Sequence, residues 1–392
     1  MTRIRTIQLT LVLFILVILF FIPVLTDSTI RFSMTSQNHT SADAWSIRPF
    51  SDASPFNIPI PDNAEIEPNS EEIVNNLLDS MSEGELFVGV DKWSVPVFFA
   101  NSSTPQQDID ITDEWAIWDT MKDVPIPENA LPDPEDDGHL CIIDNGTRIE
   151  YDFWQAEKTP SGWTASWGNK ISLDSDGIYR DSWGARGSGF ALAAGLIFPH
   201  EIDRGLIEHA LVYSTDWFYV KSGGAVRPAT TSDGISNDPL AIPEGARLQL
   251  NPSIDVDDLE MEEAGKVIAR AMQNYGMFLC DNGGGHQVYA YNPINSGYSW
   301  EGILDTDDDG ISWIFNSSIS ITDFRVLKLG PQIPDPGERT TLPDYIIYTS
   351  NTGTQSEFLP VLISLVLSHP MAILGIVLVI GVIVYLIRKR KS

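Results

Sequence analysis

Cysteine and basic residues are both scarce in this chain. Two cysteines among 392 residues exclude a scaffold held together by many disulfides. Cys141 and Cys280 each lie in an apolar, strand-like run, which leaves open either one disulfide or two buried thiols. Lys and Arg number 24 against 54 Asp and Glu, so the formal net charge is −30. Such a chain repels phosphate backbones, which argues against nucleic acid as a partner.

Several motifs that carry metal, phosphate or nucleophile chemistry are also missing. The sequence has no HxH or HExxH spacing, which disfavours a zinc site. The glycine-rich stretch 184–189 lacks the Lys-Ser/Thr ending of a phosphate loop, and Ser188 lacks the GxSxG context of a nucleophile. The sequence thus indicates no required cofactor.

Charge is absent from two long apolar runs near the ends of the chain. Residues 7–25 follow Arg3 and Arg5, and residues 371–387 precede the basic tail 388–391. Both runs are about long enough to cross a bilayer. Basic flanks stay in the cytoplasm, so we expect both termini there and the body outside the cell membrane. A cleaved signal peptide is the competing interpretation, but a small-x-small cleavage site is lacking after the first run, which favours an uncleaved anchor.

This topology predicts five parts and a lipid bilayer as one partner. Four Asn-x-Ser/Thr sequons, at Asn38, Asn101, Asn145 and Asn316, are consistent with an exterior glycoprotein. The predicted parts are the N-terminal signal anchor 1–26, a flexible stalk 27–46, an exterior domain 47–330, a second stalk 331–357 and the C-terminal transmembrane segment with its basic tail, 358–392.

The sequence of the exterior domain has the pattern of a β-rich protein. From residue 86 onward, short runs of β-branched and aromatic residues alternate with Gly, Asn and Asp turn signals. This pattern predicts a mainly β fold, an antiparallel sandwich resembling a jelly roll. Asp144-Asn-Gly predicts a hairpin turn. Amphipathic spacing and capping residues predict a few helices, at 70–81, 199–204 and 257–275.

Six motifs together resemble a family of exported bacterial and archaeal proteins to which we attach no activity. They span roughly residues 54 to 300. The resemblance implies one exterior β-rich domain and carries no catalytic residues. The second apolar run differs from the freely secreted members and implies a tethered version. The motifs are SPFNIPIP (54–61), DGHL (137–140), EYDFWQA (150–156), ARGSGFALAAGLI (185–197), IEHAL (207–211) and IPEGARLQL (242–250).

Glu150, Asp152 and Trp154 are the first candidate site residues. On a strand, alternate residues share a face, so these three side chains would point the same way. Two acids beside an indole ring suit a carbohydrate, since carboxylates serve acid–base chemistry and the ring stacks on the sugar. The competing interpretation is a solvated acidic face without a ligand.

Histidine and arginine supply further candidates. His139 or His209 could act as a general base beside Asp152, although each histidine alone is more often structural. Arg186 could hold a glycan carboxylate with two hydrogen bonds, or pair with an acid inside the fold.

One acidic loop is a candidate cation site. Asp305, Asp307 and Asp309 precede Gly310 with the DxDxDG spacing that folds oxygens around Ca²⁺. The position that normally carries Glu holds Asn316, so the pattern is incomplete. The loop predicts either a structural Ca²⁺ site or an ordinary Asp-Gly turn.

Two functional hypotheses follow from these observations. The first is a membrane-tethered surface protein that binds or processes carbohydrate, whether or not it is an enzyme. The second is a non-catalytic structural or adhesion module whose partners are other cell-envelope components. Convergence of Asp152, His209, Arg186 and Trp154 in one place would favour the first hypothesis, and their dispersal would favour the second.

Overall fold

The computed structural model describes residues 48–78, 84–114, 116, 118–179 and 184–334. All of them belong to one compact unit, Trp45–Ser392, whereas the unit Met1–Ala44 lies outside the described residues. Both predicted membrane segments, the first stalk and the second stalk beyond residue 334 lie outside them too. Within the described ranges, no helix has the length and apolar character needed to cross a membrane.

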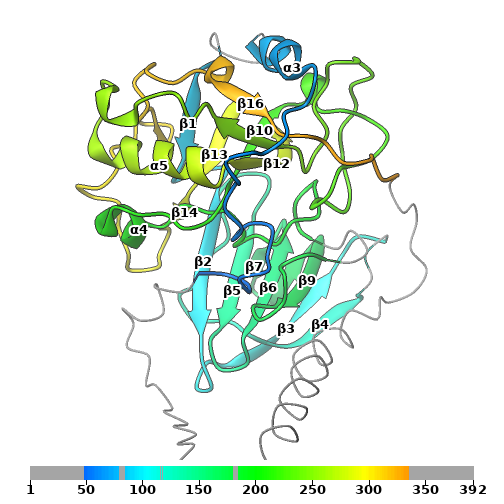
Figure 1. Cartoon of the computed structure of the whole chain (residues 1–392). Coiled ribbons are helices and arrows are strands. Elements are labelled where there is room, and N and C mark those ends of the chain that lie inside the picture. Colours follow the sequence, from blue (N-terminus) through cyan, green and yellow to red (C-terminus); the bar gives the residue numbers. More distant parts are fainter. Residues whose placement is uncertain (1–47, 79–83, 115, 117, 180–183, 335–392) are drawn as a thin grey trace, which may run out of the picture. The chain divides into compact units, whose positions relative to one another are not determined.

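The described chain is mainly β, as predicted, with three mixed sheets and a few helices (Figure 1). The largest sheet has seven strands, and its order is β15 (Ile311–Ser312), β1 (Leu86–Gly89), β13 (His286–Tyr289), β10 (Leu211–Asp216), β12 (Met277–Gly283), β11 (Arg247–Leu250) and β16 (Phe324–Val326). The second has five strands, in the order β14 (Tyr291–Asn292), β2 (Val95–Ala100), β5 (Leu140–Asp144), β6 (Ile149–Trp154) and β9 (Trp167–Ser172). The third has four strands, in the order β4 (Thr120–Pro125), β3 (Gln106–Ile111), β8 (Gly162–Ala165) and β7 (Glu157–Thr159).

The prediction that the sheets are antiparallel is wrong for part of every sheet. Five strand pairs among the described residues are parallel: β1 with β13, β10 with β12, β14 with β2, β2 with β5, and β3 with β8. Parallel neighbours need a long connection between them. The local pattern of apolar and turn residues identifies a strand but not its distant partner, so the sequence could not reveal these pairs.

The predicted hairpin at Asp144-Asn-Gly is confirmed. Strands β5 and β6 are antiparallel, and their register places Cys141 opposite Asp152 and Ile143 opposite Glu150. Strand β9 pairs with the other edge of β6. The hairpin therefore places the first candidate site residues on a central strand of the five-stranded sheet.

Three α-helices lie in the described residues. Helix α3 (Ser70–Leu77) buries the predicted apolar face, and helix α4 (Pro199–Arg204) has the predicted bounds. Helix α5 (Glu263–Asn274) begins later than predicted, because Glu262 has an extended backbone with φ −68° and ψ 160°. Short 3₁₀ helices complete the set: η3 (Trp217–Tyr219), η4 (Val256–Asp258) and η5 (Ile321–Asp323).

Hydrophobic side chains cover both faces of the five-stranded sheet. On one face, Cys141 and Ile143 join a large cluster that includes residues of the seven-stranded sheet. On the other face, Tyr151 and Phe153 join a smaller cluster with residues of the four-stranded sheet. Since successive residues of β6 alternate between the faces, Glu150 and Asp152 point toward the larger cluster.

Candidate functional site

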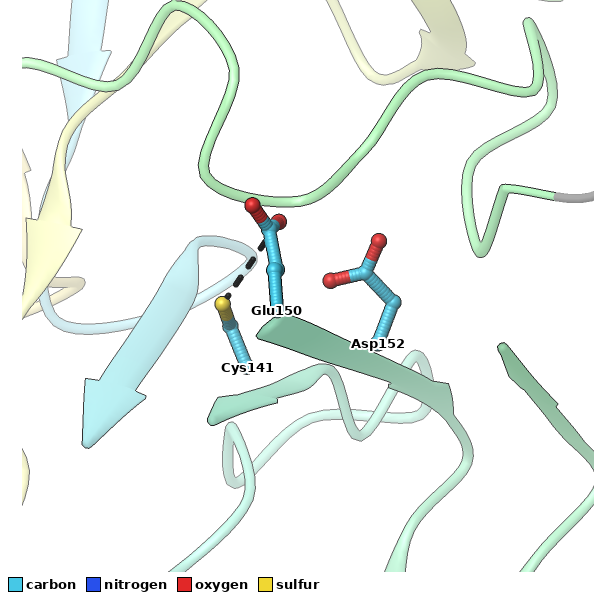
Figure 2. Close-up of side chains that lie close together, drawn as sticks. All are labelled: Cys141, Glu150 and Asp152. Atoms are coloured by element: carbon cyan, nitrogen blue, oxygen red, sulfur yellow. Dashed lines mark hydrogen bonds between the residues drawn. The ribbon is translucent and has the colours of Figure 1, made fainter. Parts of the chain in front are cut away.

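Glu150 and Asp152 share one face of β6, as the strand pattern predicts. Both side chains point away from the strand toward the segment that follows Phe190, and Cys141 of β5 stands beside them (Figure 2). A ligand atom from each of these three residues lies within 4.8 Å of the other two. We call Glu150 and Asp152 the carboxyl pair.

The alternative of a solvated acidic face is wrong. Glu150 and Asp152 are each 0 % exposed. Taking a carboxylate out of water is costly unless other groups donate hydrogen bonds to it or it keeps its proton. The contacts of the carboxyl pair therefore decide its chemistry.

The segment after Phe190 donates backbone hydrogen bonds to the carboxyl pair. Leu192 N donates to Asp152 Oδ2 at 3.2 Å, and Ala193 N donates to Glu150 Oε1 at 2.8 Å. Tyr179 Oη also donates to Asp152 Oδ2, at 2.9 Å. Glu150 Oε2 and Asp152 Oδ1 lack a well-aligned hydrogen bond among the described residues. Each of these two oxygens can therefore hold a proton or a ligand, or bond to the other carboxyl group.

Burial raises the pKa values of both carboxyl groups, and their different hydrogen bonds and neighbouring charges separate them. Burial and then the neighbouring charge of Asp152 raise the pKa of Glu150 well above its ordinary value. Burial also raises the pKa of Asp152, to about 6, although hydrogen bonds from Glu150, Tyr179 and Leu192 act in the opposite direction. Burial therefore favours a proton on the pair, and the neighbouring charge of Asp152 adds to this effect at Glu150.

Arg186 is joined to the carboxyl pair through Leu192. Its Nη2 donates to Leu192 O at 3.2 Å, while the N–H of the same residue donates to Asp152. Its Nη1 contacts Cys280 Sγ at 3.4 Å, and the guanidinium lies 4.4 Å from the ring centroid of Tyr289. Arg186 is only 3 % exposed. Its buried positive charge partly balances the charge on Asp152.

His139 belongs to the same region. Its Nε2 lies 3.3 Å from the carbonyl oxygen of Ala185, next to Arg186 in the chain. Burial lowers the pKa of His139 to about 4, and Arg186 acts in the same direction while Asp137 opposes it. The imidazole is thus neutral at pH 7, as a general base must be, and its Nδ1 lacks a hydrogen-bond partner among the described residues.

Trp154 lies where the face of β6 approaches the surface. Its side chain is half-buried, and its Nε1 donates to Asp137 Oδ1 at 3.2 Å. Glu150, Asp152 and Trp154 therefore form a row that runs from the interior toward solvent. Successive members of that row stand about 7 Å apart along the strand.

His209 has a different set of contacts. Its Nε2 lies 3.1 Å from Glu201 Oε1 of helix α4, and its Nδ1 contacts its neighbour's carbonyl oxygen, Ala210 O, at 2.9 Å. Burial disfavours the imidazolium, but the Glu201 carboxylate outweighs this effect and raises the pKa of His209 above its ordinary value. These contacts assign His209 a structural role, in tying α4 to the start of β10.

Asp305, Asp307 and Asp309 stay exposed in their loop. Both oxygens of Asp307 accept hydrogen bonds, Oδ1 from the N–H groups of Asp309 and Ile311 and Oδ2 from Trp313 Nε1. Of the described residues, two other groups bring three potential ligands within 4.8 Å of one another, and this loop is not among them. The Ca²⁺ site at 305–309 stays a prediction.

Sequence reasoning missed four contributors to the site, one of which is the backbone of Ala193, which donates to Glu150. Cys141 contacts Glu150 Oε1 through its Sγ at 3.7 Å, and Tyr179 and the backbone of Leu192 contact Asp152. Cys141 could have been found, because the hairpin register sets it opposite Asp152 on the same face. No sequence signal marks the other three, since their approach depends on distant chain segments.

Both cysteines are buried free thiols, so the disulfide alternative is wrong. Burial, with the nearby charges of Glu150 and Asp152, raises the pKa of Cys141 well above its ordinary value. A metal held by Cys141 and the carboxyl pair would have to displace protons that burial retains, and thiolate is a soft ligand whereas carboxylate is a hard one. The site therefore suits proton transfer better than metal binding.

Comparisons with family models, with curated proteins and with solved structures gave no match for this chain. The site is interpreted from its own geometry.

Proposed function

We propose that this chain is a membrane-tethered cell-surface protein that binds and processes carbohydrate, with the carboxyl pair as its acid–base group. The observation that carries the proposal is the pairing of two buried carboxyl groups with raised pKa values on one strand face, beside a tryptophan nearer the surface. Paired carboxyl groups whose environments separate their pKa values are a recurrent device for acid–base catalysis.

The row from Trp154 to Glu150 indicates how a carbohydrate would approach the carboxyl pair, from the surface at Trp154 inward. A sugar ring would stack on the half-buried indole of Trp154, and its glycosidic bond would lie toward Asp152, the next residue inward on that face. Glu150 carries the proton that a leaving oxygen needs, and Asp152 carries the charge that supports the opposite side of the reaction. Arg186 and neutral His139 lie beside this row. Arg186 contacts Leu192, and His139 interacts with Asp137.

Access to the carboxyl pair requires the backbone of Leu192 and Ala193 to withdraw, because both residues donate to it. This requirement favours the second candidate function, a non-catalytic structural or adhesion module in which the pair is only a buried anchor for that segment. Complete burial of both carboxyl groups is the observation that supports this alternative.

The remaining parts of the proposal rest on the sequence. The two apolar runs with basic flanks support the membrane tether, and the sequons support a glycoprotein. The hydrophobic cluster shared by the five- and four-stranded sheets supports a sandwich in the exterior domain. The jelly-roll likeness and the resemblance to exported proteins stay predictions.

The test combines a glycan array with a screen for polysaccharide degradation, both on the full-length chain in detergent. We expect one glycan class to bind and to be cleaved. Asp152→Asn should reduce turnover at least about 100-fold, since an amide cannot carry the charge or exchange the proton. Trp154→Ala should weaken binding about three- to tenfold through the lost stacking.

Asp174→Asn is the matched control, because Asp174 is an exposed carboxylate in the same domain that pairs with Arg148. It should leave turnover and binding unchanged. Full turnover in Asp152→Asn would refute the assignment of the carboxyl pair. If the unmodified chain shows no binding and no turnover, carbohydrate processing is rejected and the adhesion module is the function that remains.

A further inference from the structure

A second group of carboxyl side chains lies outside the carboxyl pair: Asp233, Glu244 and Asp281. One carboxylate oxygen from each lies within 4.8 Å of the other two. They come from three segments, a loop, the turn before β11 and strand β12. Glu244 is fully buried, Asp281 is half-buried and Asp233 is exposed. The group therefore extends from the interior to solvent, and a small ion can reach it.

Glu244 has an unmet bonding requirement in this group. Its Oε2 accepts a hydrogen bond from Asp233 N at 3.1 Å. Its Oε1 has no hydrogen-bond partner among the described residues, although the side chain is 0 % exposed. A buried carboxylate oxygen without a partner is costly, and native folds rarely keep one without a reason. A bound cation would satisfy that oxygen.

The spacing suits calcium. Ca²⁺ binds oxygen at about 2.3–2.6 Å, so two ligands on opposite sides of the ion are about 4.6–5.2 Å apart. The three carboxylate oxygens lie within 4.8 Å of one another, so all three can be ligands of one Ca²⁺ ion. We propose that Asp233, Glu244 and Asp281 form a Ca²⁺-binding site.

This site would also stabilise the segment that carries Arg186. The carboxyl carbon of Asp233 lies so close to Gly187 that a Cβ added there would be 2.7 Å away. The N–H of Gly187 also donates to Asp281. A cation held by Asp233 and Asp281 therefore fixes the loop next to Arg186, whose guanidinium contacts the segment over the carboxyl pair. The proposal does not depend on carbohydrate processing, because it concerns binding of an ion alone.

Calorimetric titration of CaCl₂ into the full-length chain in detergent tests the proposal. Bound metal is first removed with a chelator, and MgCl₂ is present to occupy weak, unspecific acidic sites. We expect one Ca²⁺ site and a rise in melting temperature on binding. Asp233→Asn and Glu244→Gln should each weaken binding at least about tenfold. Asp307→Asn is the control, because Asp307 belongs to the other acidic loop and should leave this site intact.

Asp233→Asn and Glu244→Gln together distinguish a loss of Ca²⁺ binding from misfolding. Asp233 is exposed, so its change to Asn leaves the core unchanged, whereas Glu244→Gln alters a buried group. The proposal is overturned if the unmodified chain binds no Ca²⁺ under these conditions, or if Asp233→Asn binds it as tightly as the unmodified chain. Loss of binding in Asp307→Asn alone would overturn it in favour of the 305–310 loop.

Discussion

At the scale of single residues, burial raises the pKa values of both carboxyl groups on β6, and their contacts make the two groups different. The same strand face in solvent would present two ordinary acids. Within the core, Asp152 accepts hydrogen bonds from Tyr179 and Leu192, while Glu150 accepts one from Ala193 and has a pKa well above its ordinary value. The chemistry of these residues therefore derives from their surroundings more than from their identity.

The raised pKa of Asp152 predicts a dependence of stability on pH. Its pKa rises from 3.8 to about 6 on folding, so the folded state holds the proton more tightly than the unfolded state. The stabilisation is complete below about pH 4 and is lost as the pH rises through about 6, an effect on the order of 3 kcal/mol. Asp152→Asn should remove this part of the slope, as measured by urea unfolding at several pH values.

Two comparisons make that measurement specific. Asp133 also has a pKa raised to about 6, chiefly by burial, so Asp152→Asn should keep a residual slope in the same range. Asp174→Asn should keep the full slope, because that carboxylate is exposed. An unchanged slope in Asp152→Asn would show that Asp152 does not hold a proton more tightly in the folded state.

At the scale of elements, helix ends and strand pairs depend on backbone details. Helix α5 packs on the seven-stranded sheet, and Gly276 turns the chain from the helix into β12 (Figure 1). Gly276 has a φ of +69°, and an added Cβ would lie 2.3 Å from the carbonyl oxygen of Leu248. Only glycine fits this junction between α5, β11 and β12.

Gly276→Ala should therefore destabilise the protein by at least about 1 kcal/mol, through the positive φ and the steric contact. Thermal or urea unfolding measures the change. Gly284→Ala is the matched control: nothing lies within 4 Å of an added Cβ there, so its effect should stay within about 0.5 kcal/mol. Equal stability of the two variants would contradict this account of the junction.

At the scale of the whole molecule, the sequence predicts an exterior body held at both ends. The strong acidity, the apolar runs and their basic flanks all favour that arrangement. The described residues account for the body alone, since both runs lie outside them. The predicted topology places the body and the carboxyl terminus on opposite sides of the membrane.

Labelling of one introduced cysteine at a time tests the topology. The native Cys141 and Cys280 are buried and should react little, so they need not be removed. A maleimide that cannot cross membranes should label Ser161→Cys, at an exposed turn of the body, on intact cells. It should label Ser392→Cys, in the basic tail, only after permeabilisation. Labelling of Ser392→Cys on intact cells would contradict a cytoplasmic carboxyl terminus.

Three features could be predicted from the residues alone: the β-rich class, the hairpin at Asp144-Asn-Gly and the shared face of Glu150 and Asp152. These features depend on local turn chemistry and on the alternation of side chains along a strand, which a short stretch of residues encodes. The predicted Ca²⁺ loop at 305–309 and the membrane segments are local patterns too, and they stay predictions.

Tertiary structure alone decided the parallel strand pairs, the burial of the carboxyl pair and the different surroundings of His139 and His209. It also brought Asp233, Glu244 and Asp281 together from three segments. The physical reason is common to all of them. Each depends on which distant segment packs against a residue, and that choice is made by the whole core, so no local pattern records it.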